Sequence, residues 1–252
     1  MRLRGYPWLS MDLMARIGGR ALRLARDPRG LPRAVARRVA PNSPRYGVDW
    51  VHLADGAITF REAEFVAASS PAMLLARHNY EVRRIHEELT NCSATRSLEI
   101  GCGYGRLSMA FAQHSVHHTA VDINVTALRA ARLAYSSVGF SQAQASHLPF
   151  KDGAFGLITT WTVLQHVRPE RIEQTCRELR RVLAPRGTIL ACEETRSPDN
   201  TGGHTWHRRV EDYRRLFDPL RLIRHGNIAE IDHIPGMHSP GEVMHFRQVQ
   251  AC

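Results

Sequence analysis

The chain has 252 residues, of which 43% are hydrophobic and 23% charged, a composition typical of globular proteins and unlike disordered or fibrous ones. Its net charge is +10, but residues 1–45 alone hold eleven arginines and two aspartates, so the rest is nearly neutral and does not indicate nucleic-acid binding. No stretch reaches the roughly 18 uninterrupted apolar residues that a membrane-spanning helix needs, so we expect no transmembrane segment.

Cysteine usage bears on the compartment. The five cysteines are an odd number and form no CxxC pair, which argues against a disulfide framework and against a zinc site. The chain also starts without the apolar core and small residues of a secretory signal. We therefore expect a reducing, cytoplasmic location.

The first segment, residues 1–45, is basic and is interrupted by prolines. Residues 8–26 within it have the spacing of an amphipathic helix, with Leu13, Ile17 and Leu24 on one face. Such a helix can lie on a membrane surface or contact an anionic partner, serve as a targeting presequence, or pack on the main domain with its basic edge in solvent. The pattern leaves these alternatives open and favours the packed helix.

The remaining chain divides into a helical cap over residues 46–90 and a main domain over residues 91–252. The cap contains a predicted helix over residues 71–89 that starts at a proline, which needs no donor in a first turn. Beyond it, short strands alternate with helices, which is typical of parallel βαβ units. Strands are expected at 96–101, 118–123, 141–145, 155–161, 187–194, 221–223 and 243–249, and helices at 106–114, 124–135, 169–183 and 207–217.

A glycine-rich motif ends the first of these strands. Glu99 precedes Gly101, Gly103 and Gly105, and one residue separates each pair of glycines. Glycines let the backbone turn tightly and approach a ligand closely. A dinucleotide-binding motif has two residues between its second and third glycines, and the position of that third glycine is Arg106 here.

An acidic residue ends the next strand. Asp122 follows Gly105 by seventeen residues and closes the apolar stretch that precedes Asn124. An acid at the tip of the second strand is placed to accept both hydroxyls of a ribose. The alternative is that Asp122 caps the helix expected to start at Asn124.

Four segments in order now resemble a known family: SLEIGCGYGRLSMAFA, AVDIN, LPFKDGAFGLITTWTVLQHV and LRRVLAPRGTIL. Together they resemble the successive motifs of class I S-adenosylmethionine-dependent methyltransferases, most closely the group of ubiquinone and menaquinone C-methyltransferases and small-molecule O- and N-methyltransferases. The resemblance implies an α/β fold: a Rossmann-like, doubly wound, mostly parallel seven-stranded sheet with an antiparallel final strand, here with the N-terminal helical cap. It implies S-adenosyl-L-methionine as cofactor and S-adenosyl-L-homocysteine as product.

The resemblance also implies which residues bind the cofactor. The glycine loop would hold its methionine part, Asp122 the ribose, and the later segments the adenine and the sulfonium. The implied residues are Glu99, Gly101, Cys102, Gly103, Gly105, Asp122, Ile123, Ala145, Ser146, Thr160 and Trp161. The chain departs from the family at Gln144, Gly156 and Arg186, where aspartate, aspartate and glycine are usual.

Three histidines are candidates for a general base toward an acceptor that carries a proton: His166, His204 and His207. His166 has an alternative role in packing at the start of the next helix, which we favour. His204, His207 and Glu211 have spacing compatible with a metal site. We expect no metal, because the fourth strand ends in Thr160-Trp161 instead of the aspartate of metal-dependent catechol-type enzymes.

We therefore expect metal-independent methyl transfer to a small-molecule acceptor at O, N or C. The stretch from Thr160 to Val163 lacks the Asn/Asp-Pro-Pro-aromatic turn of enzymes that methylate base nitrogens, so we expect no nucleic-acid partner. Two alternatives stay open. One is an RNA or protein methyltransferase that uses the basic residues 1–45, and the other is a non-catalytic scaffold of the same fold.

Overall fold

The computed structural model describes residues 71–195, 205–228 and 241–248, which belong to one compact unit. The helix expected over residues 8–26, the rest of the basic segment, the first part of the cap and His204 lie outside the described residues. No helix in the described ranges is long and apolar enough to cross a membrane.

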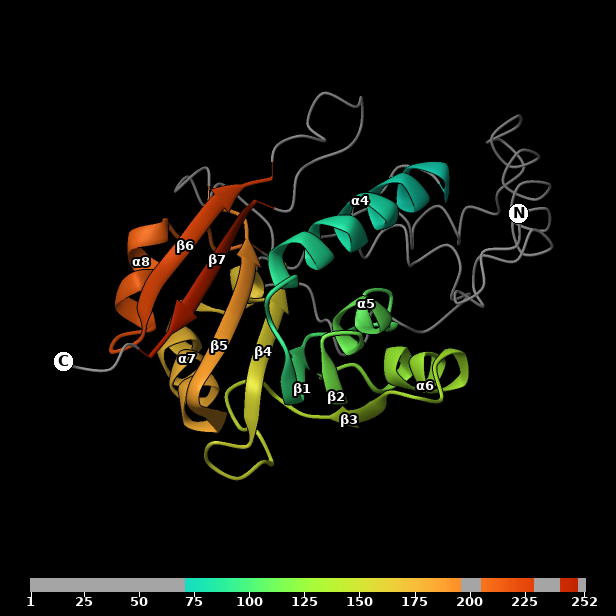
Figure 1. Cartoon of the computed structure of the whole chain (residues 1–252), viewed down its shortest axis with the longest axis horizontal. Helices are drawn as coiled ribbons and strands as arrows, with labels where there is room; N and C mark the ends of the chain where they lie inside the picture. The colour runs from blue at the N-terminus through green and yellow to red at the C-terminus, as the bar shows by residue number, and fades with distance from the viewer. Residues whose placement is uncertain (1–70, 196–204, 229–240, 249–252) are drawn as a thin grey trace, which may run out of the picture. The chain divides into compact units, whose positions relative to one another are not determined.

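One sheet of seven strands organises the fold, in the order β3-β2-β1-β4-β5-β7-β6 (Figure 1). Strands β1 to β5 pair in parallel, whereas β7 is antiparallel to both β5 and β6. This confirms the predicted mostly parallel sheet with an antiparallel final strand. The strands are β1 (Ala94–Ile100), β2 (Ser115–Asp122), β3 (Gly139–Gln142), β4 (Phe155–Trp161), β5 (Leu183–Glu193), β6 (Arg221–Asn227) and β7 (Glu242–Arg247).

Helices cover both faces of this sheet (Figure 1). One apolar cluster joins α4 and α5 to Leu157 and Leu190, and the other joins α7 and α8 to Ile158 and Ile189. Successive side chains of a strand point to opposite faces, so neighbouring residues of β4 and β5 supply the two layers. The helices are α4 (Pro71–Leu89), α5 (Ser108–Ala112), α6 (Val125–Ala134), α7 (Pro169–Val182) and α8 (Val210–Leu216), and a 3₁₀ turn, η3 (Leu164–His166), precedes α7.

The structure corrects several expected boundaries. Helix α6 begins after Asn124, because the Asn124 side chain caps it by accepting the backbone N–H groups of Thr126 and Ala127 at 3.0 and 2.9 Å. Strand β3 ends at Gln142, since the chain turns where His147 N–H donates to Gln144 O. Helices α5 and α8 are shorter than the ranges 106–114 and 207–217, and β6 extends beyond 223 to Asn227.

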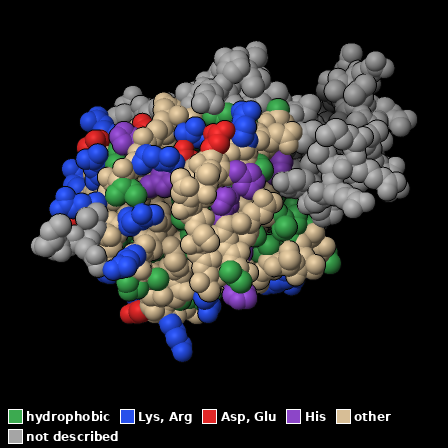
Figure 2. Space-filling model, viewed as in Figure 1, with side chains coloured by type: hydrophobic (Ala, Val, Ile, Leu, Met, Phe, Trp, Pro, Cys, Tyr) green, Lys and Arg blue, Asp and Glu red, His purple; other side chains and the backbone are tan. Residues whose placement is uncertain are grey.

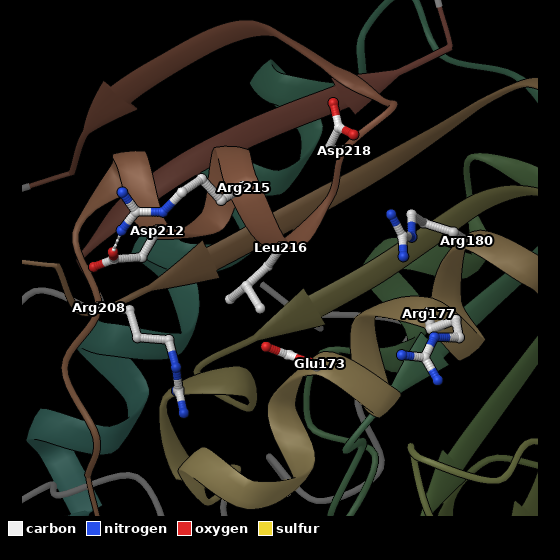
Figure 3. A pocket seen from close by; sticks show the side chains of 8 residues that line it. All are labelled: Glu173, Arg177, Arg180, Arg208, Asp212, Arg215, Leu216 and Asp218. Carbon is white, nitrogen blue, oxygen red and sulfur yellow. Dashed lines mark hydrogen bonds and ion pairs between the residues drawn. The ribbon is translucent and has the colours of Figure 1, made fainter.

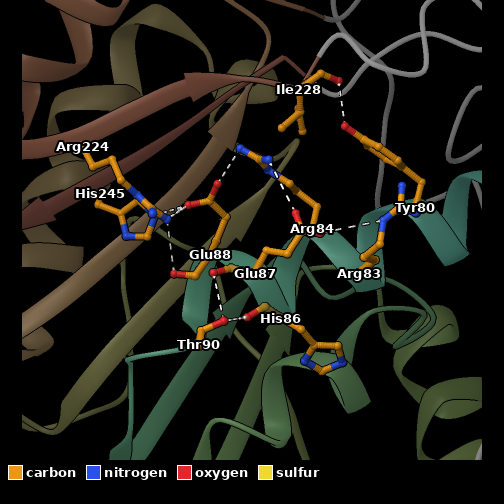
Figure 4. Close-up of polar contacts among 10 residues, drawn as sticks. All are labelled: Tyr80, Arg83, Arg84, His86, Glu87, Glu88, Thr90, Arg224, Ile228 and His245. Atoms are coloured by element: carbon orange, nitrogen blue, oxygen red, sulfur yellow. Dashed lines mark hydrogen bonds and ion pairs between the residues drawn. The ribbon is translucent and has the colours of Figure 1, made fainter.

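Helix α4 is fastened to the antiparallel end of the sheet through Glu88 (Figure 4). Glu88 Oε1 accepts from Arg84 Nη2 at 2.7 Å, and Oε2 lies 2.7 Å from His245 Nε2 on β7. Arg224 on β6 also pairs with Glu88 Oε2. The Glu88 side chain is only 7% exposed, so these contacts form a partly desolvated clamp between α4, β6 and β7.

The outer strand of this end of the sheet is protected by charge. Among the described strands, β6 pairs only with β7, and its Arg221 and Arg224 are exposed. Figure 2 shows arginine side chains spread over the face that carries β6 and β7. Exposed charges on an edge strand discourage pairing with another chain.

Candidate functional site

The carboxyl ends of β1, β2, β4 and β5 meet at one edge of the sheet, where open α/β sheets bind ligands. The loop after β1 has left-handed backbone at Gly101, Gly103 and Gly105, with φ of 71°, 52° and 76°. A Cβ atom on Gly101 would lie 2.5 Å from Val163 Cγ2, so the loop passes directly against the turn after β4. The glycines predicted for this loop are therefore required by its conformation.

Asp122 holds the same loop from the end of β2. Its Oδ2 accepts Gly103 N–H at 2.7 Å and its Oδ1 accepts Asn124 N–H at 2.8 Å. The residue is 7% exposed. Burial raises the pKa of the carboxyl group, and backbone hydrogen bonds from Asn124, Gly103 and Ile123 oppose that rise. Asp122 thus lies beside the loop, and Asn124, not Asp122, caps α6.

Glu99 lies beneath the loop in a buried polar network that the sequence did not reveal. Its Oε2 accepts Ser108 O–H at 2.5 Å and lies 3.3 Å from His118 Nε2. His118 Nδ1 in turn lies 2.7 Å from Ser97 Oγ. Glu99 therefore joins β1 to β2 and to the first residue of α5, which stabilises the loop between them.

The residues predicted for the adenine side are Ile123, directly after Asp122, and Ala145 and Ser146 in the turn after β3, the strand that pairs with β2. Ile123 is 37% exposed, and its carbonyl oxygen accepts from Gln142 Nε2 at 3.1 Å. Ser146 is buried, and its hydroxyl lies 3.1 Å from His147 Nδ1. Ala145 is partly buried against the core cluster of α7 and α8. The structure thus brings an exposed apolar side chain and a short turn to the end of β2 and β3.

At the end of β4, Trp161 contacts Glu81 of α4, which in turn binds two arginines. Its Nε1 donates to Glu81 Oε1 at 3.1 Å. The same oxygen accepts from Arg77 Nε at 3.0 Å, and Glu81 Oε2 pairs with Arg106 Nη1 at 2.5 Å. Burial would raise the pKa of Glu81, yet Arg106 and Arg77 hold it below its usual value. An ionised carboxylate and two guanidinium groups therefore stand beside the loop.

The turn after β4 begins with a strained residue. Thr162 has φ of 56°, which a β-branched residue rarely adopts. Its N–H donates to Cys192 O at 2.7 Å, and its hydroxyl donates to Trp161 O at 2.7 Å. Such strain persists only where surrounding contacts fix it, and it often accompanies function.

The turn itself is held from β5 and from the segment before α8. Thr160 Oγ1 donates to Glu193 Oε1 at 2.9 Å, and Gln165 N–H donates to Glu193 Oε2 at 3.1 Å. Trp206 N–H donates to Gln165 O at 2.7 Å. Two predicted catalytic residues therefore approach one another: His166 ends η3, and His207 follows Trp206.

Sequence reasoning missed the residues of α4 that reach this edge and the acid of β5. Arg77, Glu81, Arg84 and Glu88 recur at helical spacing, a pattern that usually marks a solvated face with ion pairs. Helix α4 instead buries Arg77 and Glu81. No signal local to α4 distinguishes the two cases.

A separate pocket of about 540 Å³ lies between α7 and α8, outside the glycine loop (Figure 3). Its lining carries both signs of charge, and Arg215 pairs with Asp212 across part of it. The lining residues are Glu173, Arg177, Arg180, Arg208, Asp212, Arg215, Leu216 and Asp218. None of these contacts the glycine loop or Asp122 in a described hydrogen bond, so we place the candidate site at the sheet edge. Within the described ranges, no group of three or more His, Cys, Asp or Glu side chains is arranged for a metal ion.

Comparisons with known proteins concern this same part of the chain. Residues 98–191 match the family described as a methyltransferase domain. An uncharacterised methyltransferase of Synechocystis sp. is 28% identical over 114 residues, which are 45% of this chain and 53% of that protein. The demethylmenaquinone methyltransferase of Clavibacter sepedonicus is 34% identical over 106 residues, 41% of this chain and 42% of that protein. The chain spans about half the length of the first curated relatives that it matches.

A solved structure gives the same fold at lower identity. Phosphoethanolamine N-methyltransferase 1 of Haemonchus contortus, in complex with phosphoethanolamine and S-adenosylhomocysteine, superposes with a TM-score of 0.59 at 13% identity. The match covers 69% of this chain and 43% of that one. At this identity the likeness shows the fold, which includes the sheet edge described above.

Proposed function

We propose that this chain transfers a methyl group from S-adenosylmethionine to a small-molecule acceptor, at O, N or C. The proposal rests on its class I S-adenosylmethionine-dependent methyltransferase domain. The observation that supports this most is the pairing of Asp122 with Gly103 at 2.7 Å, which places an acid from β2 beside the glycine loop of β1. We propose that S-adenosylhomocysteine is the product.

The residues at this edge fit the cofactor. An ionised carboxylate has about four acceptor positions. Asp122 uses two of them on backbone N–H groups, which leaves capacity for the two hydroxyls of a ribose. Ile123 is the exposed apolar side chain beside it, suited to an adenine face. Gly101 and Gly105 keep side chains out of the loop that would hold the cofactor.

The charged residues fit the amino-acid end of the cofactor. Arg77 and Arg106 carry two positive charges, and Glu81 between them carries one negative charge. An ammonium and a carboxylate on one ligand would find partners of both signs here. We propose that Arg106 faces the carboxylate and that the negative charges of Glu81 and Glu99 favour the ammonium.

The bound cofactor supplies a methyl group on a positively charged sulfur, which is displaced in line. The protein therefore has to align the acceptor, exclude water and remove a proton where the acceptor carries one. Thr160 and Trp161 close the end of β4, and α4 covers Trp161 through Glu81. We propose His166 or His207 as the proton acceptor, because a neutral imidazole serves this role near pH 7. We also propose that no metal takes part, since β4 ends without an acid.

The experiment is calorimetric titration of the full chain with S-adenosylmethionine and with S-adenosylhomocysteine. We expect micromolar binding, weakened at least about tenfold, or about 1.4 kcal/mol, by Asp122→Ala. Asp152→Ala is the matched control, because the Asp152 side chain is 80% exposed and lies at the opposite end of β4. Folded wild-type protein, free of bound cofactor, that binds neither compound would remove the proposal and leave a non-catalytic scaffold.

A further inference from the structure

We propose that Glu193 is a positioning residue for the turn that carries His166: the turn closes over the neutral carboxyl group and opens when that group is ionised. The proposal rests on the proposed function only in giving His166 a role in the reaction. The contacts themselves need no ligand, so they are tested separately.

Glu193 joins three segments from the end of β5. Its side chain is 0% exposed and accepts Thr160 O–H from β4 at 2.9 Å. The other oxygen accepts Gln165 N–H from η3 at 3.1 Å. The neighbouring backbone adds to this, because Glu194 N–H donates to Gln165 Oε1 at 2.7 Å. Closure of the turn and burial of Glu193 are therefore one event.

Among the residues that the structure describes, no cationic side chain forms an ion pair with Glu193. Arg208, which lies close to Cys176 and Tyr213, gives its N–H groups to the carbonyl oxygens of Leu164 at 2.9 Å and Val167 at 2.6 Å. Uncharged hydrogen-bond donors compensate a buried charge less well than an ion pair does. Ionisation therefore favours any arrangement in which the turn moves away and water reaches the carboxylate.

The other titratable groups around Glu193 supply no compensating charge. They are Cys176 on α7, Tyr213 on α8 and Cys192 on β5. Burial raises the pKa of each, to about 12 for Cys176, so all three are neutral near pH 7. Burial likewise raises the pKa of Glu193 to about 7, against its backbone hydrogen bonds from Gln165 and Leu164 and its side-chain bond from Thr160. The turn thus responds to pH in the neutral range.

Hydrogen exchange of the full chain, followed by mass spectrometry on the peptide that contains Gln165, measures opening of the turn. After correction for the intrinsic effect of pH, we expect wild-type exchange there to be about tenfold faster at about pH 8 than at about pH 6. Glu193→Gln keeps the shape without an ionisable group, so its exchange should stay slow and show no such step. Glu193→Asp retains the carboxyl group and should retain the step.

Glu170→Gln is the control for loss of a carboxylate, since Glu170 is exposed on the first turn of α7. It should behave as the wild type does. A wild-type profile without the step, or a step that persists in Glu193→Gln, would overturn the proposal. If Glu193→Gln fails to fold, the exchange profiles of the wild type and of Glu193→Asp against pH still test the proposal. If the wild type shows the step in exchange but does not bind S-adenosylhomocysteine, the role of Glu193 in the turn stands and the proposed function fails.

Discussion

Trp161 and Glu81 are joined by a hydrogen bond of 3.1 Å across 80 residues of sequence. The bond links the end of β4 to α4, and Arg106 extends the link to the glycine loop through the second oxygen of Glu81. One buried carboxylate thus holds together three segments that surround the proposed cofactor site. Helix α4 thus supplies the residue that links the end of β4 to the glycine loop.

Replacing this carboxylate should be costly. In Glu81→Gln the guanidinium groups of Arg77 and Arg106 lose the charge that offsets their burial. Breaking a buried pair typically costs about 3–5 kcal/mol, so we expect the free energy of unfolding to fall by about 3 kcal/mol. Urea unfolding near pH 7 measures it. The control is Glu87→Gln, on the same helix, because the Glu87 side chain is 54% exposed. This substitution should change the free energy of unfolding by less than about 0.5 kcal/mol. Equal stability of the two variants would contradict the role given to Glu81.

The close approach of Gly101 to Val163 makes a second prediction. Gly101→Ala would place a Cβ atom 2.5 Å from Val163 Cγ2 at a φ of 71°, so we expect a loss of about 2–3 kcal/mol in unfolding free energy. Val163→Ala removes the methyl groups that clash. In the double variant we expect at least about 1 kcal/mol of that loss to be recovered, beyond the sum of the single effects. Strictly additive effects would show that backbone strain, and not the contact, dominates at Gly101.

Local patterns predicted much of the fold and part of the site. Residue spacing suffices to predict three features, because neighbouring residues determine each of them. These are the glycine loop, the strand that ends in Asp122 and the apolar strand that ends in Trp161. The buried side of α4 is different. Its charges look like a solvated stripe until the partners Trp161 and Arg106 are known, and those partners lie far along the chain. Tertiary contacts, not propensity, decide which face of such a helix is buried.

Glu193 illustrates the same limit at the end of β5. An acid after the apolar run TILAC resembles an ordinary strand end that leaves the sheet for solvent. Its burial depends on the turn after β4 folding over it, which no local pattern predicts. The hydrogen bond from Trp206 N–H to Gln165 O brings the segments of His166 and His207 near one another. Residue spacing could not predict it for the same reason, because its two partners lie far apart in the sequence.

The clamp around Glu88 makes a third prediction, which concerns local opening. Glu88→Gln removes the charge that Arg84 and Arg224 share, and it weakens the contact with His245. We expect hydrogen exchange in the second half of α4 to become at least about fivefold faster, because a charge-assisted bond is worth about 1.5–3 kcal/mol when lost. The amides of α7, on the other face of the sheet, should not change. Uniform acceleration in both helices would mean that global stability, and not docking of α4, had changed.

The final prediction concerns the pH dependence of global stability. The pKa of Glu193 is about 7 in the folded chain and near 4.5 when unfolded, so the folded state binds this proton more tightly. The stabilisation is complete below about pH 4.5, falls as the pH rises and is lost above about pH 7. The measurement is urea unfolding of the wild type and of Glu193→Gln across this pH window. The other titrating groups are the same in both proteins, so their contributions cancel in the difference between the two unfolding free energies. Between about pH 4.5 and about pH 7 the unfolding free energy of the wild type should fall by about 3 kcal/mol relative to that of the variant. Outside this window the difference between the two proteins should stay constant. A difference independent of pH would show that Glu193 ionises as freely in the folded chain as in water, and the closed turn over it would then have no electrostatic cause to open.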